Sequence, residues 1–138
     1  MRIMAIDYGD AHTGIAISDP TGFLAGFTTV INAYRPEVVA EQVAALAKEH
    51  GVEELVLAHP INMDGTRGPR SEKAQAMKAL LEETTSLPVV LWDERRTTID
   101  AHQILMNSGK NAKKRKKVVD AVAATLILEG YLTYKKSH

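Results

Sequence analysis

The chain has no cysteine among its 138 residues, which excludes disulfide bonds, thiolate metal sites and a cysteine nucleophile. Aromatic residues make up only 5% of the chain and are not interleaved with basic residues, so an extended platform for stacking single-stranded bases is not expected. No apolar run approaches the roughly 20 residues that span a bilayer, and no signal-peptide cleavage pattern follows Met1. We therefore expect a cytoplasmic protein with no membrane partner.

The apolar content is sufficient for one packed domain over residues 1–138. Apolar residues make up 45% of the chain, and a chain of this length can bury about two thirds of the surface that its unfolded form exposes. No internal repeat, low-complexity tract or linker divides it. We therefore expect a single continuous domain.

The net charge is zero, but the positive charge is concentrated. Removing the six basic residues of one eight-residue window from the total of 17 leaves 11 basic against 17 acidic residues. An acidic body with one basic segment favours a polyanion as partner, and a solvated helix face is the alternative interpretation. The six residues are Lys110, Lys113, Lys114, Arg115, Lys116 and Lys117.

The hydrophobic pattern changes its period along the chain. Apolar runs at about 3–6, 14–18 and 23–31, joined by short turns, predict an antiparallel meander of three strands. Helices and strands then alternate, with helices at 36–50, around 74–81, at 97–108 and at 113–134, and strands at 55–58 and 88–92. This order predicts an α/β fold with a mixed five-stranded sheet and helices on its faces, the skeleton of a ribonuclease-H-like domain.

Acidic residues stand where the predicted strands end. Asp7 closes the first strand, and Asp93 and Glu94 follow the fifth. Ligands of open α/β sheets bind beyond the carboxyl ends of the strands, although a single acid there also serves as a turn former or helix cap. Position alone therefore leaves both roles open for each of them.

Asp120 lies within the apolar stripe of the last predicted helix, among residues 123, 124, 127 and 131. A buried aspartate needs a partner, which is either a basic side chain such as Arg95 or a metal ion. We favour the metal. Three carboxylates suit Mg²⁺ or Mn²⁺ rather than zinc, and two such ions roughly 4 Å apart could activate water against a phosphodiester.

Four ordered blocks of the sequence resemble the YqgF/RuvX family of ribonuclease-H-like proteins, which are described as Holliday-junction resolvases and linked to maturation of the 5′ end of the small-subunit ribosomal RNA precursor. The resemblance implies that Asp7, Glu94 and Asp120 form the catalytic and metal-binding site, with Asp93 as the alternative to Glu94. Strand alternation lets only one of these two neighbours face the site. The four blocks are Ile6–Gly9 with Gly14–Asp19, Pro60–Thr66, Leu87–Thr98 and Lys113–Ala121.

Basic residues near these acids are the predicted contacts to substrate phosphates. The segment before Asp120 is one group, and arginines in the loop after the fourth strand and beside Glu94 form the others. Two stretches depart from the family pattern: the first turn, Asp10–Thr13, lacks basic residues, and His59 follows Ala58 where the family has a leucine. The predicted contacts are Arg67, Arg70, Arg96, Lys113, Lys114, Arg115, Lys116 and Lys117.

The resulting hypothesis is a metal-dependent endonuclease. By family association its substrate is pre-16S rRNA before branched DNA, with a pre-ribosomal particle as a further partner and a monomer or a homodimer as the working form. A second hypothesis is a nucleic-acid-binding or ribosome-binding module that has lost the chemistry. A third is a fragment of a sugar-kinase or actin-like ATPase, because the segment Ile6–Gly9 followed by a hairpin also resembles a phosphate-binding segment of those proteins.

Overall fold

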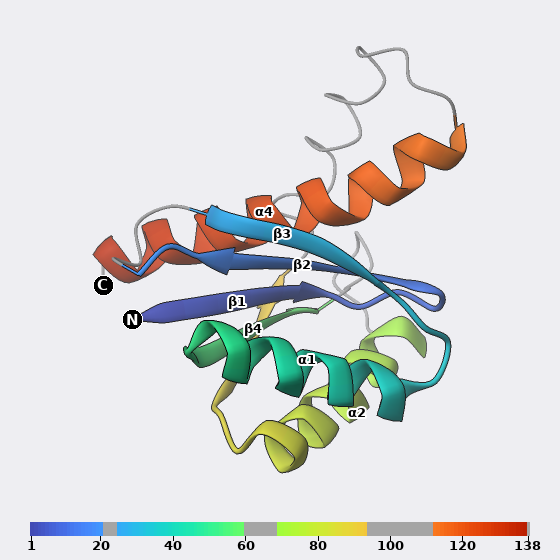
Figure 1. Ribbon diagram of the computed structural model, residues 1–138, viewed down its shortest axis with the longest axis horizontal. Coiled ribbons are helices and arrows are strands. Elements are labelled where there is room, and N and C mark those ends of the chain that lie inside the picture. The colour runs from blue at the N-terminus through green and yellow to red at the C-terminus, as the bar shows by residue number, and fades with distance from the viewer. Residues whose placement is uncertain (21–24, 60–68, 94–111, 138) are drawn as a thin grey trace.

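The computed structural model describes residues 1–20, 25–59, 69–93 and 112–137, and within them it leaves out the side chains of 25, 69, 70, 93, 112–121, 136 and 137 (Figure 1). The helix predicted at 97–108 lies outside the described residues. All other predicted elements are present. They are β1 (Arg2–Asp7), β2 (His12–Ser18), β3 (Ala25–Asn32), α1 (Pro36–His50), β4 (Val52–His59), α2 (Pro69–Thr85), β5 (Val89–Asp93) and α4 (Ala112–Ser137).

The five strands form one mixed sheet in the order β3-β2-β1-β4-β5. The pairs β1/β2 and β2/β3 are antiparallel, whereas β1/β4 and β4/β5 are parallel. The short turns of the first half produce the meander, and the helical crossovers of the second half produce the parallel pairs. The predicted α/β architecture is confirmed.

Helices cover both faces of the sheet. Figure 1 shows α1 and α2 on one face and α4 on the other. The core under α1 and α2 is built from large aliphatic side chains, including Met4, Ile6 and Leu57, all fully buried. These side chains alternate along their strands with those facing α4, as the period of two requires.

The core under α4 is built differently. The sheet presents the small side chains Ala5, Ala16 and Ala58 to this helix beside larger ones such as Ile3, and Ala124 of α4 belongs to the same core. Small residues on both surfaces let a helix backbone lie close to a sheet, because no bulky side chain separates them. α4 packs chiefly on β2 and β1, the central strands of the sheet.

Helix α1 has the predicted ends. Pro36 occupies the first turn, where its missing N–H removes no hydrogen bond. Gly51 ends the helix with φ +66° and donates its N–H to the carbonyl oxygens of Ala47 and Lys48. A side chain at this position would meet no neighbour within 4 Å, so the glycine is needed for its left-handed backbone and not for space.

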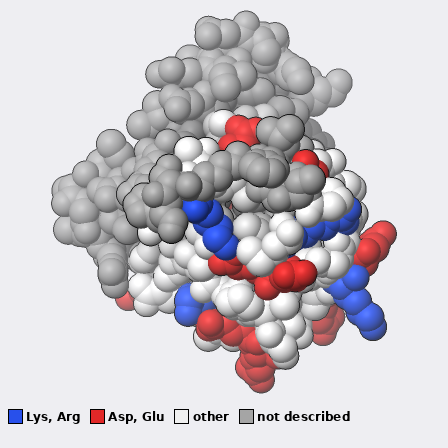
Figure 2. Space-filling view, turned by 90° about the vertical axis from the view of Figure 1, so that its left-hand side faces the viewer, with Lys and Arg blue, Asp and Glu red and all other residues white. Residues whose placement is uncertain are grey.

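Charges of both signs are interspersed over the described surface at the end of the molecule where β1 begins (Figure 2). The opposite end is where β1 finishes and where α4 starts (Figure 1). Within the described ranges, no helix is both long enough and apolar enough to cross a bilayer.

Candidate functional site

The carboxyl ends of the three parallel strands meet at one edge of the sheet. Ile6 of β1 is level with Leu57 of β4, and the last residue of β4, His59, is level with the last residue of β5, Asp93. Asp7 is therefore level with the end of β4. This edge is where an open α/β sheet binds its ligands.

Asp7 faces the side of the sheet that α4 covers. Ile3 and Ala5 belong to the core under α4, whereas Met4 and Ile6 belong to the core under α1 and α2. Strand alternation therefore directs the carboxylate of Asp7 toward α4, where it is half-buried.

The neighbour of Asp7 on β2 is Gly14. Directly opposed residues of an antiparallel pair share a face, so a side chain at this position would stand beside the carboxylate. Gly14 leaves that space free of any β2 side chain.

Residue 120 lies in α4, one helical turn before Ala124. Ala124 and Ile127 are fully buried against the sheet, and Ala123 is almost so, which confirms the apolar stripe expected for this helix. The Asp120 side chain is outside the described part of the structure. Its backbone and the carboxylate of Asp7 are on the same side of the sheet.

Asp93 is the last residue of β5 and its side chain is not described, while Glu94 lies outside the described residues. The side chains before them follow the alternation. Val90 and Trp92 join the core under α4, and Val89 joins the core under α1 and α2. Trp92 is buried.

His59 is turned away from Asp7. Its Nε2 is 2.6 Å from the hydroxyl oxygen of Ser71 in α2, and both side chains are buried. The sequence shows that His59 replaces a leucine of the family pattern, but it does not indicate the contact with Ser71, because no motif marks that serine. The contact fastens the first turns of α2 to the end of β4.

None of the predicted basic contacts is described in side-chain detail. Arg67 and Arg96 lie outside the described residues, and the side chains of Arg70 and of the segment Lys113–Lys117 are undescribed within α2 and α4. A basic residue that sequence reasoning missed is Lys73.

Lys73 reaches from α2 to the turn after β1. Its ammonium is 3.2 Å from a carboxylate oxygen of Asp10. The positive charge that the first turn itself lacks is thus supplied by α2. The side chains of both residues are more than half exposed, so the pair is weak and exchangeable.

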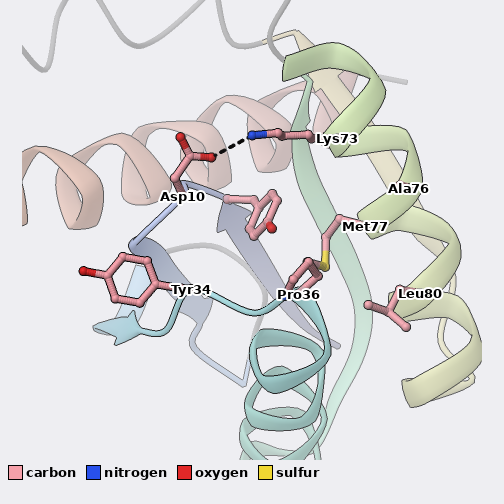
Figure 3. Close-up of a pocket in the computed structure, with 8 residues that line it drawn as sticks. Asp10, Tyr34, Pro36, Lys73, Ala76, Met77 and Leu80 are labelled. Carbon is pink, nitrogen blue, oxygen red and sulfur yellow. Dashed lines mark hydrogen bonds and ion pairs between the residues drawn. The ribbon is translucent and has the colours of Figure 1, made fainter. Parts of the chain in front are cut away.

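A pocket of about 460 Å³ opens beside this pair, between the end of β1, the start of α1 and α2 (Figure 3). Burial raises the pKa of the Tyr8 phenol in its wall; Lys73 partly opposes this shift, and Asp10 and Glu37 add to it. A tyrosine hydroxyl is protonated near neutral pH in any case, so it can donate a hydrogen bond into the pocket. The lining residues are Tyr8, Asp10, Tyr34, Pro36, Lys73, Ala76, Met77 and Leu80.

The sequence, compared with protein families, matches one family model over residues 1–134, and this model is described as "RuvX: Holliday junction resolvase". The chain belongs to the RuvX family. The resemblance seen in its four sequence blocks is thereby confirmed.

RuvX relatives cover nearly the whole chain. A protein of Halothermothrix orenii is 44% identical over 135 residues, which are 98% of this chain and 96% of the relative. A protein of Bacillus subtilis is 42% identical over 134 residues, 96% of this chain and 97% of the relative. Both are named "Putative pre-16S rRNA nuclease".

The RuvX chain also shares its fold with RuvC of Thermus thermophilus, solved in complex with a Holliday junction substrate. The TM-score is 0.64 at 14% identity, and the match covers 99% of this chain and 96% of RuvC. At this identity the match speaks for the fold alone. The ribonuclease-H-like fold expected from the order of strands and helices is confirmed.

Proposed function

We propose that this protein is a metal-dependent endonuclease that hydrolyses phosphodiester bonds in structured nucleic acid, with pre-16S rRNA as its substrate. Membership of the RuvX family and the names of the relatives support nuclease activity and this substrate. The observation that supports the location of the site is the placement of Asp7 at the carboxyl edge of the sheet, facing the helix that contains residue 120.

The proposed catalytic residues are Asp7, Glu94 and Asp120. Val90 and Trp92 of β5 face α4, and strand alternation lets only one of the two acids that follow face the site. Glu94 is preferred on its match to the family pattern, and Asp93 is kept as the alternative. Residue 120 is assigned to the same face because it continues the buried stripe of α4 by one turn.

The donor set fits Mg²⁺ or Mn²⁺. Asp7 is a half-buried carboxylate directly opposite Gly14 of β2, and the other two proposed ligands are also carboxylates, which hard cations prefer. When bound there, a divalent cation supplies Lewis-acid activation of water and stabilisation of the leaving oxygen. Both effects favour direct attack of water on a phosphodiester, without a covalent enzyme intermediate.

The chain's own residues contribute by holding the proposed site in position. β1 fixes the Asp7 carboxylate through its pairing on both sides, and the small residues under α4 hold that helix close to the sheet. The basic segment Lys113–Lys117 precedes residue 120 on the same helix by three to seven residues, about 5 to 10 Å along the axis. That spacing suits contacts with phosphates flanking the scissile bond.

The proposal includes the partners and the location. The protein would work in the cytoplasm on the rRNA precursor, within a pre-ribosomal particle or on free RNA, as a monomer or a homodimer. The second candidate substrate is a Holliday junction, which the description of the family model favours. Resolution of a symmetric junction calls for two active sites, so that reading requires the dimer.

The decisive experiment compares two labelled substrates, an RNA spanning the 5′ junction of a bacterial 16S rRNA precursor and a four-way DNA junction, with Mg²⁺ or Mn²⁺. We expect cutting of the RNA by the wild type, none with chelator, and loss of cutting in Asp7→Asn and Asp120→Asn. Circular dichroism and thermal melting verify that both variants are folded. Preferred cutting of the junction would select the second candidate substrate.

Two results would contradict the proposal. Equal cutting by the wild type and both variants would mean that the activity comes from a contaminating nuclease. Binding of the RNA without cutting, under every metal condition, would leave the non-catalytic module as the function.

A further inference from the structure

We propose that the pocket lined by Tyr8, Tyr34 and Lys73 receives one unpaired nucleobase of the substrate strand, next to the nucleotide that is cut. The inference rests on the proposed nuclease function and adds a requirement to it, namely a substrate with an unstacked nucleotide beside the scissile phosphate.

The position of the pocket relative to Asp7 supports this role. Tyr8 follows Asp7 directly, so their Cα atoms are about 3.8 Å apart. Their side chains lie on opposite sides of the sheet, with Asp7 toward α4 and Tyr8 packed against the core under α1 and α2. A nucleic-acid strand that crosses this edge with a phosphate at Asp7 therefore brings the adjacent base to the pocket.

The lining of the pocket matches the chemistry of a base. Pro36, Met77 and Leu80 provide apolar surface for the flat faces of the ring (Figure 3). The Tyr8 hydroxyl, which like any tyrosine hydroxyl is protonated near neutral pH, provides a hydrogen-bond donor for the polar edge of the ring. The volume, about 460 Å³, is in the range of small-molecule sites and far too small for a paired duplex.

Tyr34 is the aromatic surface that is most available for stacking. Its side chain is 81% exposed, the highest value among the exposed large hydrophobic residues in the described part of the chain. An exposed tyrosine at the rim of an apolar pocket has no role in the core, and base–aromatic stacking tolerates any base sequence. The two tyrosines form a site for one base and not an extended platform, which agrees with the low aromatic content of the chain.

Lys73 adds attraction for the sugar–phosphate backbone. Its partner Asp10 is a solvent-exposed carboxylate at 3.2 Å, and such a pair is readily exchanged for a phosphate oxygen. The dashed line in Figure 3 marks this ion pair at the pocket. The occupant therefore combines an apolar flat ring with a nearby negative charge, which is the chemistry of a nucleotide.

The test measures binding in chelator, where no cutting occurs, by fluorescence anisotropy of the labelled rRNA precursor fragment. We expect Tyr34→Ala to weaken binding about 5- to 150-fold, the range that loss of one stacked base produces. Tyr134→Ala is the matched control, because Tyr134 is also an exposed tyrosine but contacts Trp92 and Tyr131 on the α4 side. Tyr8→Phe, which keeps the ring and removes the hydroxyl, should weaken binding less.

A scan with single abasic nucleotides identifies the base. The wild type should lose affinity at one position beside the cut, and Tyr34→Ala should show no further loss there. Equal binding by Tyr34→Ala and Tyr134→Ala, or an unchanged abasic profile in Tyr34→Ala, overturns the pocket assignment while carboxylate-dependent cutting would still support the nuclease. Failure of the wild type to bind either nucleic acid overturns both proposals.

Discussion

Enlarging one buried alanine of α4 tests the proposed site through the packing that holds it. Ala124 is fully buried in the core under α4, which also contains Ala5, Ala16 and Ala58, themselves at most 3% exposed. Ala124→Leu adds three carbon atoms at a position with no exposed surface, in a core where these alanines have no rotamer to change. Overpacking of this kind costs typically about 1–3 kcal/mol, and we expect the upper half of that range.

The functional effect should exceed the effect on stability. α4 can accept the larger side chain only by moving away from the sheet, which separates residue 120 from Asp7. A displacement of about 1 Å in a catalytic arrangement can reduce the rate by about 100-fold. We expect a loss of that order in kcat/KM for RNA cutting, measured at a temperature where urea titration shows the variant to be fully folded.

The control is the same substitution on the other face of the sheet. Ala47 lies in α1, is 4% exposed and belongs to the core under α1 and α2. Ala47→Leu should lower the urea midpoint by a similar amount and leave cutting within a few-fold of the wild type. Full activity in folded Ala124→Leu, or an equal loss in both variants, would refute the placement of the site between β1 and α4.

Three further predictions concern charges and a buried hydrogen bond. Changing Lys113, Lys114 and Lys116 together to alanine should weaken nucleic-acid binding and make the slope of log K against log salt shallower by about 2 to 3; an unchanged slope would mean that these residues do not touch the substrate. Asp10→Asn should strengthen RNA binding at low salt, because it frees the lysine of α2, and the gain should disappear at high salt in the same titration. Ser71→Ala should lower the free energy of unfolding by about 1–3 kcal/mol in urea titrations, because the buried histidine ring loses its contact with the serine hydroxyl; a value near zero would contradict the 2.6 Å contact.

The order of strands and helices is the part of the fold that can be predicted from the sequence. Hydrophobic periods, short turns and a glycine after His50 report local preferences, and the structure follows them in the meander, in the parallel pairs and in the left-handed cap at Gly51. The apolar stripe of α4 belongs to the same class, because helical spacing alone defines it. The acidic residues at the strand ends can be recognised in the sequence for the same reason, because the ends of the apolar runs mark where the strands end.

Contacts between distant segments are the part of the structure that could not be predicted from the sequence. Lys73 and Asp10 are 63 residues apart in the sequence, and His59 contacts Ser71, which no sequence motif marks. Tyr8 packs against the core under α1 and α2, a contact that only the structure shows. Such pairings depend on how α2 lies on the sheet, which no local preference encodes.

The position of β1 between two hydrogen-bonded neighbours limits how this chain tolerates changes in length. Deleting a single residue within Arg2–Ile6 would shift part of the strand by one position. Either Asp7, which follows the deletion, or the side chains that precede the deletion would then face the opposite side of the sheet. In the first case the carboxylate turns toward α1 and α2; in the second, deleting Ala5 or Ile6 turns Met4 into the layer under α4 and Ile3 out of it. Insertions and deletions among related chains should therefore avoid this strand and collect in the connections between elements.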